Sequence, residues 1–371
     1  PVVSSARLLP ARSGLGADMD GQTTIWRVET KTRASTAFAI VAALAICAGL
    51  AAPMYLPRAT LQDLFFILTM LALAQSWNLL AGYAGLVSVG QQAFVGLGAY
   101  VMFAGVVLLK LDPLVAILLG GIASALLAIP AGIFAFRLQG AYFAIGTWVI
   151  AEIVRLLVAQ WKMLGGGTGT SLPASATRHM QGVDLVHRMF GFRPAQAVDV
   201  VCYWLALLLA VAAIFMVYRL LRSRHGLALA SVRDNQDAAR AVGVDARRLK
   251  ALVYLASALV TGLVGALIYV QKARISPDAA FSVTDWTAYV IFIVVIGGIG
   301  TIEGPIVGVL VFFALQKLLA DFGSIYLMVL GLIGIVVMLF APQGLWGLFA
   351  SRTGIQLLPV RRLLRGGLIK N

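Results

Sequence analysis

Two long apolar runs enclose a polar and basic stretch at residues 222–250, RSRHGLALASVRDNQDAARAVGVDARRLK. Its middle carries the start and stop signals of a short helix. Asp234 can cap the helix, with Asp237 three residues later as in a capping box, and Gly243 can adopt the left-handed conformation that ends it. Helices this short are marginal in water by themselves. We therefore expect residues 234–243 to form a helix that is supported by contact with something else.

The expected helix has one small apolar face, made by Ala238, Ala239 and Val242, which suits a groove on a partner protein. The sequence Asp237-Ala238-Ala239, followed after three residues by Gly243, resembles the E-A-A-x-x-x-G loop of ABC importer permeases, with Asp in place of Glu. The resemblance implies that the helix docks into a separate ATPase subunit. The residues implied in this coupling are Asp234, Asp237, Ala238, Ala239 and Gly243. The alternative is an ordinary solvated loop.

The composition is that of a membrane protein. Of the 371 residues, 61% are hydrophobic and only 12% are charged, whereas soluble domains have about 45–50% and about 25%. Mean hydropathy is +0.93. The net charge of +14 does not indicate nucleic-acid binding, because the basic residues lie in loops between apolar runs, where they set topology. Cys47 and Cys202 fall within apolar runs and indicate neither a disulfide nor a metal site.

Ten apolar runs approach the length of about 20 residues that a helix needs to cross a lipid bilayer. They cover residues 34–56, 61–81, 89–109, 113–136, 141–162, 199–221, 251–271, 287–299, 303–320 and 325–341. The run at 287–299 is short and 303–320 follows at once, so these are either two short spans or a broken pair. The sequence therefore predicts an all-α polytopic membrane protein with about ten transmembrane helices, some broken or re-entrant.

The distribution of positive charge predicts the orientation. With residues 1–33 inside, the inside segments hold 19 lysines and arginines, and the outside segments hold eight. Cytoplasmic loops are enriched in positive charge. We therefore expect both termini in the cytoplasm, with a polar tail at 1–33, a transmembrane domain at 34–341 that includes the cytoplasmic loop 222–250, and a basic tail at 342–371. We do not expect the first of these tails to be a signal peptide, because it has no apolar segment of its own.

A second informative stretch covers residues 75–100, QSWNLLAGYAGLVSVGQQAFVGLGAY. Its five glycines permit close helix packing or a broken helix. Asn78, Ser88, Gln91 and Gln92 bring polar groups to membrane depth, where irregular backbone is tolerated only inside protein or along a cavity. Transporters commonly place such broken helices at the substrate path. These four side chains are therefore candidate path residues, and the alternative is packing through small residues alone.

The same stretch resembles the motif N-L-x-x-G-x-x-G-x-x-S-x-G-x-x-A-F of the branched-chain amino acid permeases of bacterial ABC importers. The matching residues are Asn78, Leu79, Gly82, Gly85, Ser88, Gly90, Ala93 and Phe94. The resemblance implies a non-enzymatic subunit of the inner membrane that imports branched-chain or other hydrophobic amino acids. Its implied partners are a second related permease, two ATPase subunits that bind ATP and magnesium, and a periplasmic or extracellular binding protein. The subunit itself would hold no cofactor.

Residues 296–308, IGGIGTIEGPIVG, repeat part of this pattern late in the chain. Gly297-x-x-Gly300 parallels Gly82-x-x-Gly85. Two interrupted segments in corresponding halves of a chain are found in transporters built from inverted repeats. An internal inverted repeat is therefore one interpretation.

Glu152 and Arg155 lie three residues apart within the apolar run 141–162. Ionisable residues at membrane depth usually face the bundle interior, and at this spacing they can pair. Glu152 is therefore a candidate lining group of the path, and the alternative is a structural ion pair near the outer end of a helix. The GGGTG at 165–169 lacks the Lys-Ser/Thr of a phosphate-binding loop, so ATP must be bound by another chain.

Two other functions stay open. Permeases for urea or short-chain amides resemble this group closely, and the ligand of the cognate binding protein would distinguish them. A stand-alone secondary transporter or channel would need coupling charges at membrane depth. More than two residues from either end of an apolar run, the charged residues available for that purpose are Glu152, Arg155 and Lys317.

Overall fold

The computed structural model describes residues 14–17, 23–29, 33–178, 180–319, 322, 325–353, 357–358 and 363–368. The chain forms two units. The larger comprises residues 45–354, and the smaller takes residues from both ends of the chain.

Ten apolar helices coincide with the ten expected spans. They are α1 (Arg33–Tyr55), α2 (Arg58–Asn78), α3 (Gln91–Val107), α4 (Pro113–Ala135), α5 (Ala141–Ala159), α8 (Pro194–Arg222), α11 (Ala246–Lys272), α13 (Tyr289–Gly297), α14 (Gly304–Leu319) and α15 (Ile325–Phe340). Eight helical segments within the described residues are long and apolar enough to cross a membrane, whereas α3 and α14 are apolar but shorter. The prediction of an all-α polytopic membrane protein is confirmed.

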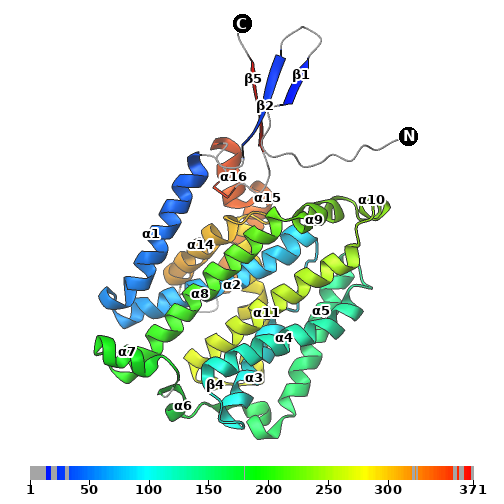
Figure 1. Ribbon diagram of the computed structural model, residues 1–371. Helices are drawn as coiled ribbons and strands as arrows, with labels where there is room; N and C mark the ends of the chain where they lie inside the picture. Colours follow the sequence, from blue (N-terminus) through cyan, green and yellow to red (C-terminus); the bar gives the residue numbers. More distant parts are fainter. Residues whose placement is uncertain are drawn as a thin grey trace. The chain divides into compact units, whose positions relative to one another are not determined.

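Short elements connect the long helices of the larger unit. They are η2 (Lys162–Leu164), η3 (Gly166–Thr168), α6 (Ala174–Arg178), α7 (Val183–Phe190), α9 (Arg224–Asp234), α10 (Gln236–Ala241), α12 (Pro277–Ala280) and α16 (Gly344–Thr353). A small antiparallel pair joins β3 (Thr170–Ser171) to β4 (Arg274–Ile275). Figure 1 shows α9 and α10 at one end of the helix bundle, with α6 and β4 at the opposite end. The loop 222–250, which contains α9 and α10, therefore lies at the end of the bundle opposite α6 and β4.

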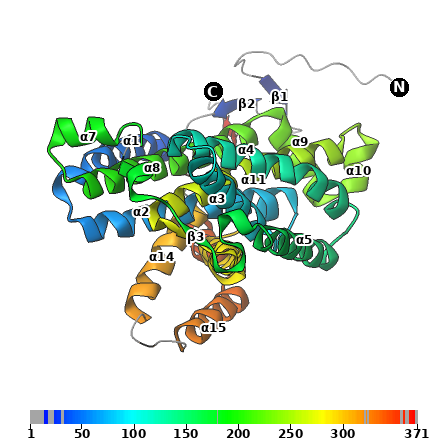
Figure 2. The ribbon, with the colours of Figure 1, turned by 90° about the horizontal axis from the view of Figure 1, so that it is seen from below.

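Glycines let α3, α4 and α11 approach one another through their backbones. A Cβ atom on Gly98 would lie 2.3 Å from the carbonyl oxygen of Gly262, and one on Gly120 would lie 2.4 Å from that of Gly98. Only glycine fits at such contacts. Figure 2 shows these helices side by side, with α14 and α15 projecting from one face of the bundle. Close packing through small residues is thus one use of the glycine-rich stretch.

The same stretch also breaks a helix, as the sequence predicted. Helix α2 continues into a π-helix, η1 (Leu79–Tyr83), and the chain between residues 85 and 90 is not helical before α3 begins. A second break separates α13 from α14 at residues 298–303. Gly85 and Gly300 have positive φ angles of 68° and 76°, which L-residues with a Cβ rarely adopt. Another π-helix, η4 (Thr284–Ala288), leads into α13. The inverted-repeat interpretation stays a prediction.

The smaller unit contains a three-stranded antiparallel sheet that the sequence analysis did not predict. Its strand order is β1 (Gly14–Ala17), β2 (Thr23–Glu29) and β5 (Leu363–Leu368). Trp26 in the middle strand is opposite Gly14 on one side and Gly366 on the other. The division into a polar tail at 1–33 and a basic tail at 342–371 stays a prediction. It did not include this sheet, because the sheet depends on a pairing between opposite ends of the chain.

Candidate functional site

The two helix breaks contact each other through side-chain to backbone hydrogen bonds. Asn78 Nδ2 donates to the carbonyl oxygen of Thr301 at 2.7 Å, and the backbone N–H of Gly300 donates to Asn78 Oδ1 at 2.8 Å. One turn earlier in α2, Gln75 Nε2 donates to the carbonyl oxygen of Ile302 at 2.6 Å. Amide side chains at the end of α2 therefore form hydrogen bonds with backbone N–H and C=O groups of the second break, which is not helical.

A close backbone contact accompanies these bonds. A Cβ atom on Gly82 would lie 2.4 Å from Asn78 Oδ1, 2.6 Å from the backbone nitrogen of Gly300 and 2.8 Å from its Cα. Any side chain at Gly82 would separate the two breaks. The parallel between the two glycine pairs in the sequence thus corresponds to a direct contact in space.

Ser88, Gln91 and Gln92 are all buried among the helices, with exposed fractions of 1–2%. Gln91 Nε2 donates to the hydroxyl of Thr261 on α11 at 3.1 Å. The hydroxyl of Thr287, in η4, donates to Gln92 Oε1. The structure therefore brings these three residues and Asn78 into the bundle interior, beside the first break. Their role in a substrate path stays a prediction.

Five buried side-chain oxygen atoms in the described part of the chain have no hydrogen-bond partner. They are Gln75 Oε1, Gln91 Oε1, Tyr100 Oη, Tyr269 Oη and Gln271 Oε1. Buried polar atoms are normally paired, with protein or with water. Two of the five flank the first break, so this region keeps acceptor capacity that a polar ligand or water can use.

Glu152 does not join this group. Arg155 Nη2 lies 2.5 Å from Glu152 Oε1, and Arg155 Nη1 lies 2.7 Å from the carboxylate of Asp278 on α12. The side chains of Glu152 and Asp278 are exposed. The expected pairing at this spacing is confirmed, and the added contact ties α5 to α12. The geometry is that of a structural ion pair, and a place for Glu152 in the path stays a prediction.

The cap of α10 differs from the sequence expectation. Asp234 ends α9 and does not cap the next helix. The cap is Asn235, whose Oδ1 accepts from the backbone N–H groups of Asp237 at 3.1 Å and Ala238 at 3.0 Å. Asp237 is exposed and pairs with Arg240 at 3.4 Å. Asn and Asp are about equally good caps, and here the extended backbone of Asn235, with φ −156° and ψ 107°, decides which of the two neighbours takes the position.

The end of α10 matches the expectation. Gly243 has a φ of 86°, and the N–H of Val244 donates to the carbonyl oxygen of Ala239 at 3.0 Å. The helix itself is shorter than predicted, at six residues. Asp245 caps the next helix, α11, by accepting from the N–H of Arg248 at 3.1 Å.

The apolar face of α10 is split between the protein interior and the surface. Ala239 is only 2% exposed, whereas Ala238 is exposed and Val242 is 78% exposed. Ala239 is therefore absent from the free surface on which the sequence analysis placed it, because α10 packs against α9 and α11. Lys250 Nζ reinforces this packing by donating to Gln236 Oε1 at 2.6 Å. The exposed apolar surface at this end of the bundle is instead made by Ala238 and Val242, together with Leu227 on α9, which is 80% exposed.

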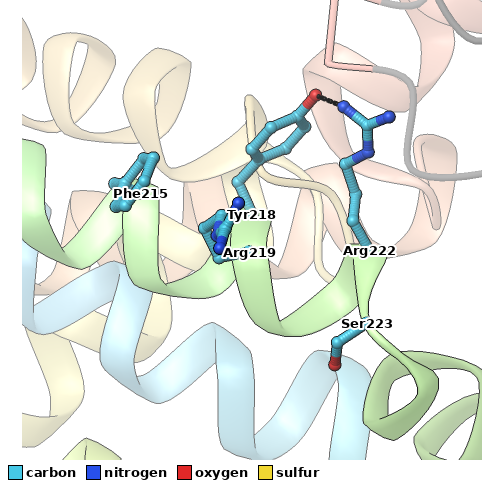
Figure 3. A pocket seen from close by; sticks show the side chains of 5 residues that line it. All are labelled: Phe215, Tyr218, Arg219, Arg222 and Ser223. Atoms are coloured by element: carbon cyan, nitrogen blue, oxygen red, sulfur yellow. Dashed lines mark hydrogen bonds between the residues drawn. The ribbon is translucent and has the colours of Figure 1, made fainter.

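A separate cavity of about 560 Å³ lies at the end of α8. Figure 3 shows its lining side chains, Phe215, Tyr218, Arg219, Arg222 and Ser223. Arg222 Nη1 donates to the hydroxyl of Tyr218 at 2.6 Å, and the guanidinium of Arg219 lies 5.9 Å from the centroid of the Phe215 ring. None of the residues predicted from the sequence as site residues lines it. Amphipathic aromatic and basic side chains of this kind suit the boundary between an apolar layer and water.

Sequence reasoning missed several partners of the candidate residues. Thr261, Thr287 and Thr301 contact Gln91, Gln92 and Asn78 from positions about two hundred residues later in the chain. Arg233, in the last turn of α9, donates to the carbonyl oxygen of Gly82. No local pattern marks these residues, because each acts only through a long-range contact.

A family model described as the permease component of branched-chain amino acid transport systems matches residues 59–341. The chain belongs to this permease family. The match contains both helix breaks and the loop with α9 and α10. The family assigned from the two sequence motifs is therefore confirmed, and the permease is a transmembrane subunit of an ABC transport system.

Two bacterial relatives are each 30% identical to the permease. One is the high-affinity branched-chain amino acid transport system permease protein LivM of Escherichia coli K12, with 310 aligned residues that cover 79% of this chain and 71% of the relative. The protein of the same name from Salmonella typhimurium LT2 aligns over 305 residues, with the same shares of 79% and 71%. No solved structure matches the permease.

Proposed function

We propose that this chain is one of two permease subunits of a bacterial ABC importer that carries branched-chain or other hydrophobic amino acids into the cytoplasm. The family match over residues 59–341 carries the proposal, and the names of the bacterial relatives supply the substrate class. The other subunits are a second related permease, two ATPases that bind ATP and magnesium, and an extracytoplasmic binding protein. This chain holds no cofactor and performs no hydrolysis.

The proposed orientation has both termini and the loop 222–250 in the cytoplasm, and the membrane is the inner membrane. The charge bias of the sequence supports it, since basic residues are enriched on the cytoplasmic side. The loop contains α9 and α10, which lie at one end of the bundle (Figure 1). Our proposal for ATPase coupling involves Asp234, Asp237, Ala238, Ala239 and Gly243, with the exposed Ala238 and Val242 as the contact surface.

The proposed substrate path runs beside the first helix break. Asn78, Ser88, Gln91 and Gln92 are buried there at membrane depth, where polar groups are costly unless they are satisfied by protein or by a polar passage. The unpartnered Oε1 of Gln91 can accept a hydrogen bond from a substrate ammonium group. We place Glu152 at the outer edge of this path, beside Arg155.

The test of the docking surface is Val242→Arg. A charge that is buried at an interface without a partner costs several kcal/mol, enough to abolish a transient contact. Because Val242 is 78% exposed, the substitution leaves the fold of the permease intact. The variant should reach the membrane, fail to co-purify with its ATPase subunits and not support ATP-driven uptake of radiolabelled leucine.

Leu185→Arg provides the matched control, since it adds the same charge at a 62% exposed position on α7, at the far end of the bundle. It should leave ATPase association unchanged. If Val242→Arg co-purifies and transports like the wild type, the docking role is wrong. Uptake of urea in place of leucine by the wild-type assembly would overturn the proposed substrate class.

A further inference from the structure

The C-terminal turn of α9 is in direct contact with the first helix break. Arg233 Nη1 donates a hydrogen bond to the carbonyl oxygen of Gly82, in η1. The same nitrogen lies 3.3 Å from the position that a Cβ atom on Gly300 would occupy. One guanidinium therefore reaches the point where the two breaks meet.

The carbonyl groups at the end of a helix need such a donor. The last four carbonyls of a helix have no N–H partner within it, and they carry the negative end of the helix dipole, which attracts cations. Gly82 is buried and lies in the last helical turn before the break at residues 85–90. Arginine suits the position because its charge is permanent and several N–H donors share one plane.

Arg233 is connected to α10 by a very short path. Only Asn235 separates α9 from α10. Its N–H donates to the carbonyl oxygen of Ser231 in α9 at 3.0 Å, while its side chain caps α10. A displacement of α10 is thus transmitted to the last turn of α9, where Arg233 lies.

We propose that Arg233 is a positioning residue that couples the docking loop to the two helix breaks. This inference rests on the proposed importer function. In the arrangement seen here Arg233 holds the Gly82 carbonyl beside Gly300. When ATPase subunits pull on α10, the guanidinium withdraws from the carbonyl, and the two breaks become free to move together. Removal of Arg233 therefore uncouples ATP hydrolysis from transport and leaves docking intact.

The experiment compares Arg233→Met with Arg233→Lys and Arg224→Met in the complete importer, reconstituted in vesicles with binding protein and radiolabelled leucine. Arg224 is a matched control, because it is an exposed arginine on the same helix whose side chain makes no hydrogen bond or ion pair within the described part of the chain. All three variants should co-purify with the ATPases. Arg233→Met should lose uptake by about tenfold or more, the effect expected for one charge-assisted hydrogen bond. It should also lose the stimulation of ATP hydrolysis by leucine-loaded binding protein.

Arg233→Lys should recover a substantial part of both activities, because it keeps a charged donor, and Arg224→Met should behave like the wild type. Thermal unfolding of each variant identifies any loss of the fold itself. Wild-type uptake by Arg233→Met would overturn the coupling role, and so would loss of ATPase association, since that would make Arg233 a docking residue. Failure of the docking surface itself is distinguished by Val242→Arg, which should lose ATPase association as well as uptake.

Discussion

Substitution of Gly82 by alanine tests the contact between the two helix breaks. The added Cβ would lie 2.4 Å from Asn78 Oδ1 and 2.6 Å from the backbone nitrogen of Gly300. Ordinary van der Waals contacts are about 3.5–4.0 Å, so the breaks must move apart by about 1 Å. Overpacking of this kind costs about 1–3 kcal/mol. Loss of the bond from Gly300 to Asn78 leaves buried polar groups unpaired and costs about 1–3 kcal/mol more.

The expected result is a total destabilisation of about 2–6 kcal/mol, measured as a fall in the thermal unfolding temperature of the purified protein. The permease should still reach the membrane. Its uptake of leucine should fall together with its unfolding temperature, because both breaks are displaced. Gly331→Ala is the control, because a Cβ there meets nothing within 4 Å. In a helix interior that change is expected to stabilise by about 0.5–1 kcal/mol. Equal unfolding temperature and uptake for Gly82→Ala and the wild type would refute the contact.

Two further predictions concern the path and the orientation. The double substitution Gln91→Leu and Gln92→Leu should reduce leucine uptake by about tenfold, the effect of losing one hydrogen bond of about 1.4 kcal/mol, with ATPase association unchanged. Normal uptake would make these residues a packing feature only. With the exposed Cys47 replaced by serine, a cysteine at the exposed position Ala230 should react with a membrane-impermeant thiol reagent in inside-out vesicles and not in intact cells. Labelling from outside the cell would reverse the proposed topology.

The spans were predictable because bilayer thickness imposes a length on every apolar run. Local backbone chemistry was also predictable where a single residue decides it. Gly243 ends α10 in the left-handed conformation, and Asp245 caps α11, since each effect depends on neighbours within four residues. Both helix breaks could be located for the same reason, from the spacing of their glycines.

The errors share a different cause. Asp234 and Asn235 are adjacent residues with nearly equal capping ability, and the choice between them depends on how α9 packs against the rest of the bundle. The burial of Ala239 likewise depends on α9 and α11. Strands β2 and β5 pair across more than three hundred residues, and no local pattern specifies which distant segment completes such a sheet.

The two breaks stabilise each other, and this explains how irregular backbone persists at membrane depth. A helix that stops inside the hydrocarbon leaves N–H and C=O groups that lipid cannot satisfy. Asn78 supplies both a donor and an acceptor to the second break, and Gln75 supplies another donor. Arg233 satisfies a carbonyl of the first break. Because the groups that satisfy the second break belong to the segment that forms the first, one break cannot move far without exposing buried polar groups of the other. The pair is therefore expected to move as one cooperative element, and the hydrogen bond from Arg233 to Gly82 links this element to the loop with α9 and α10.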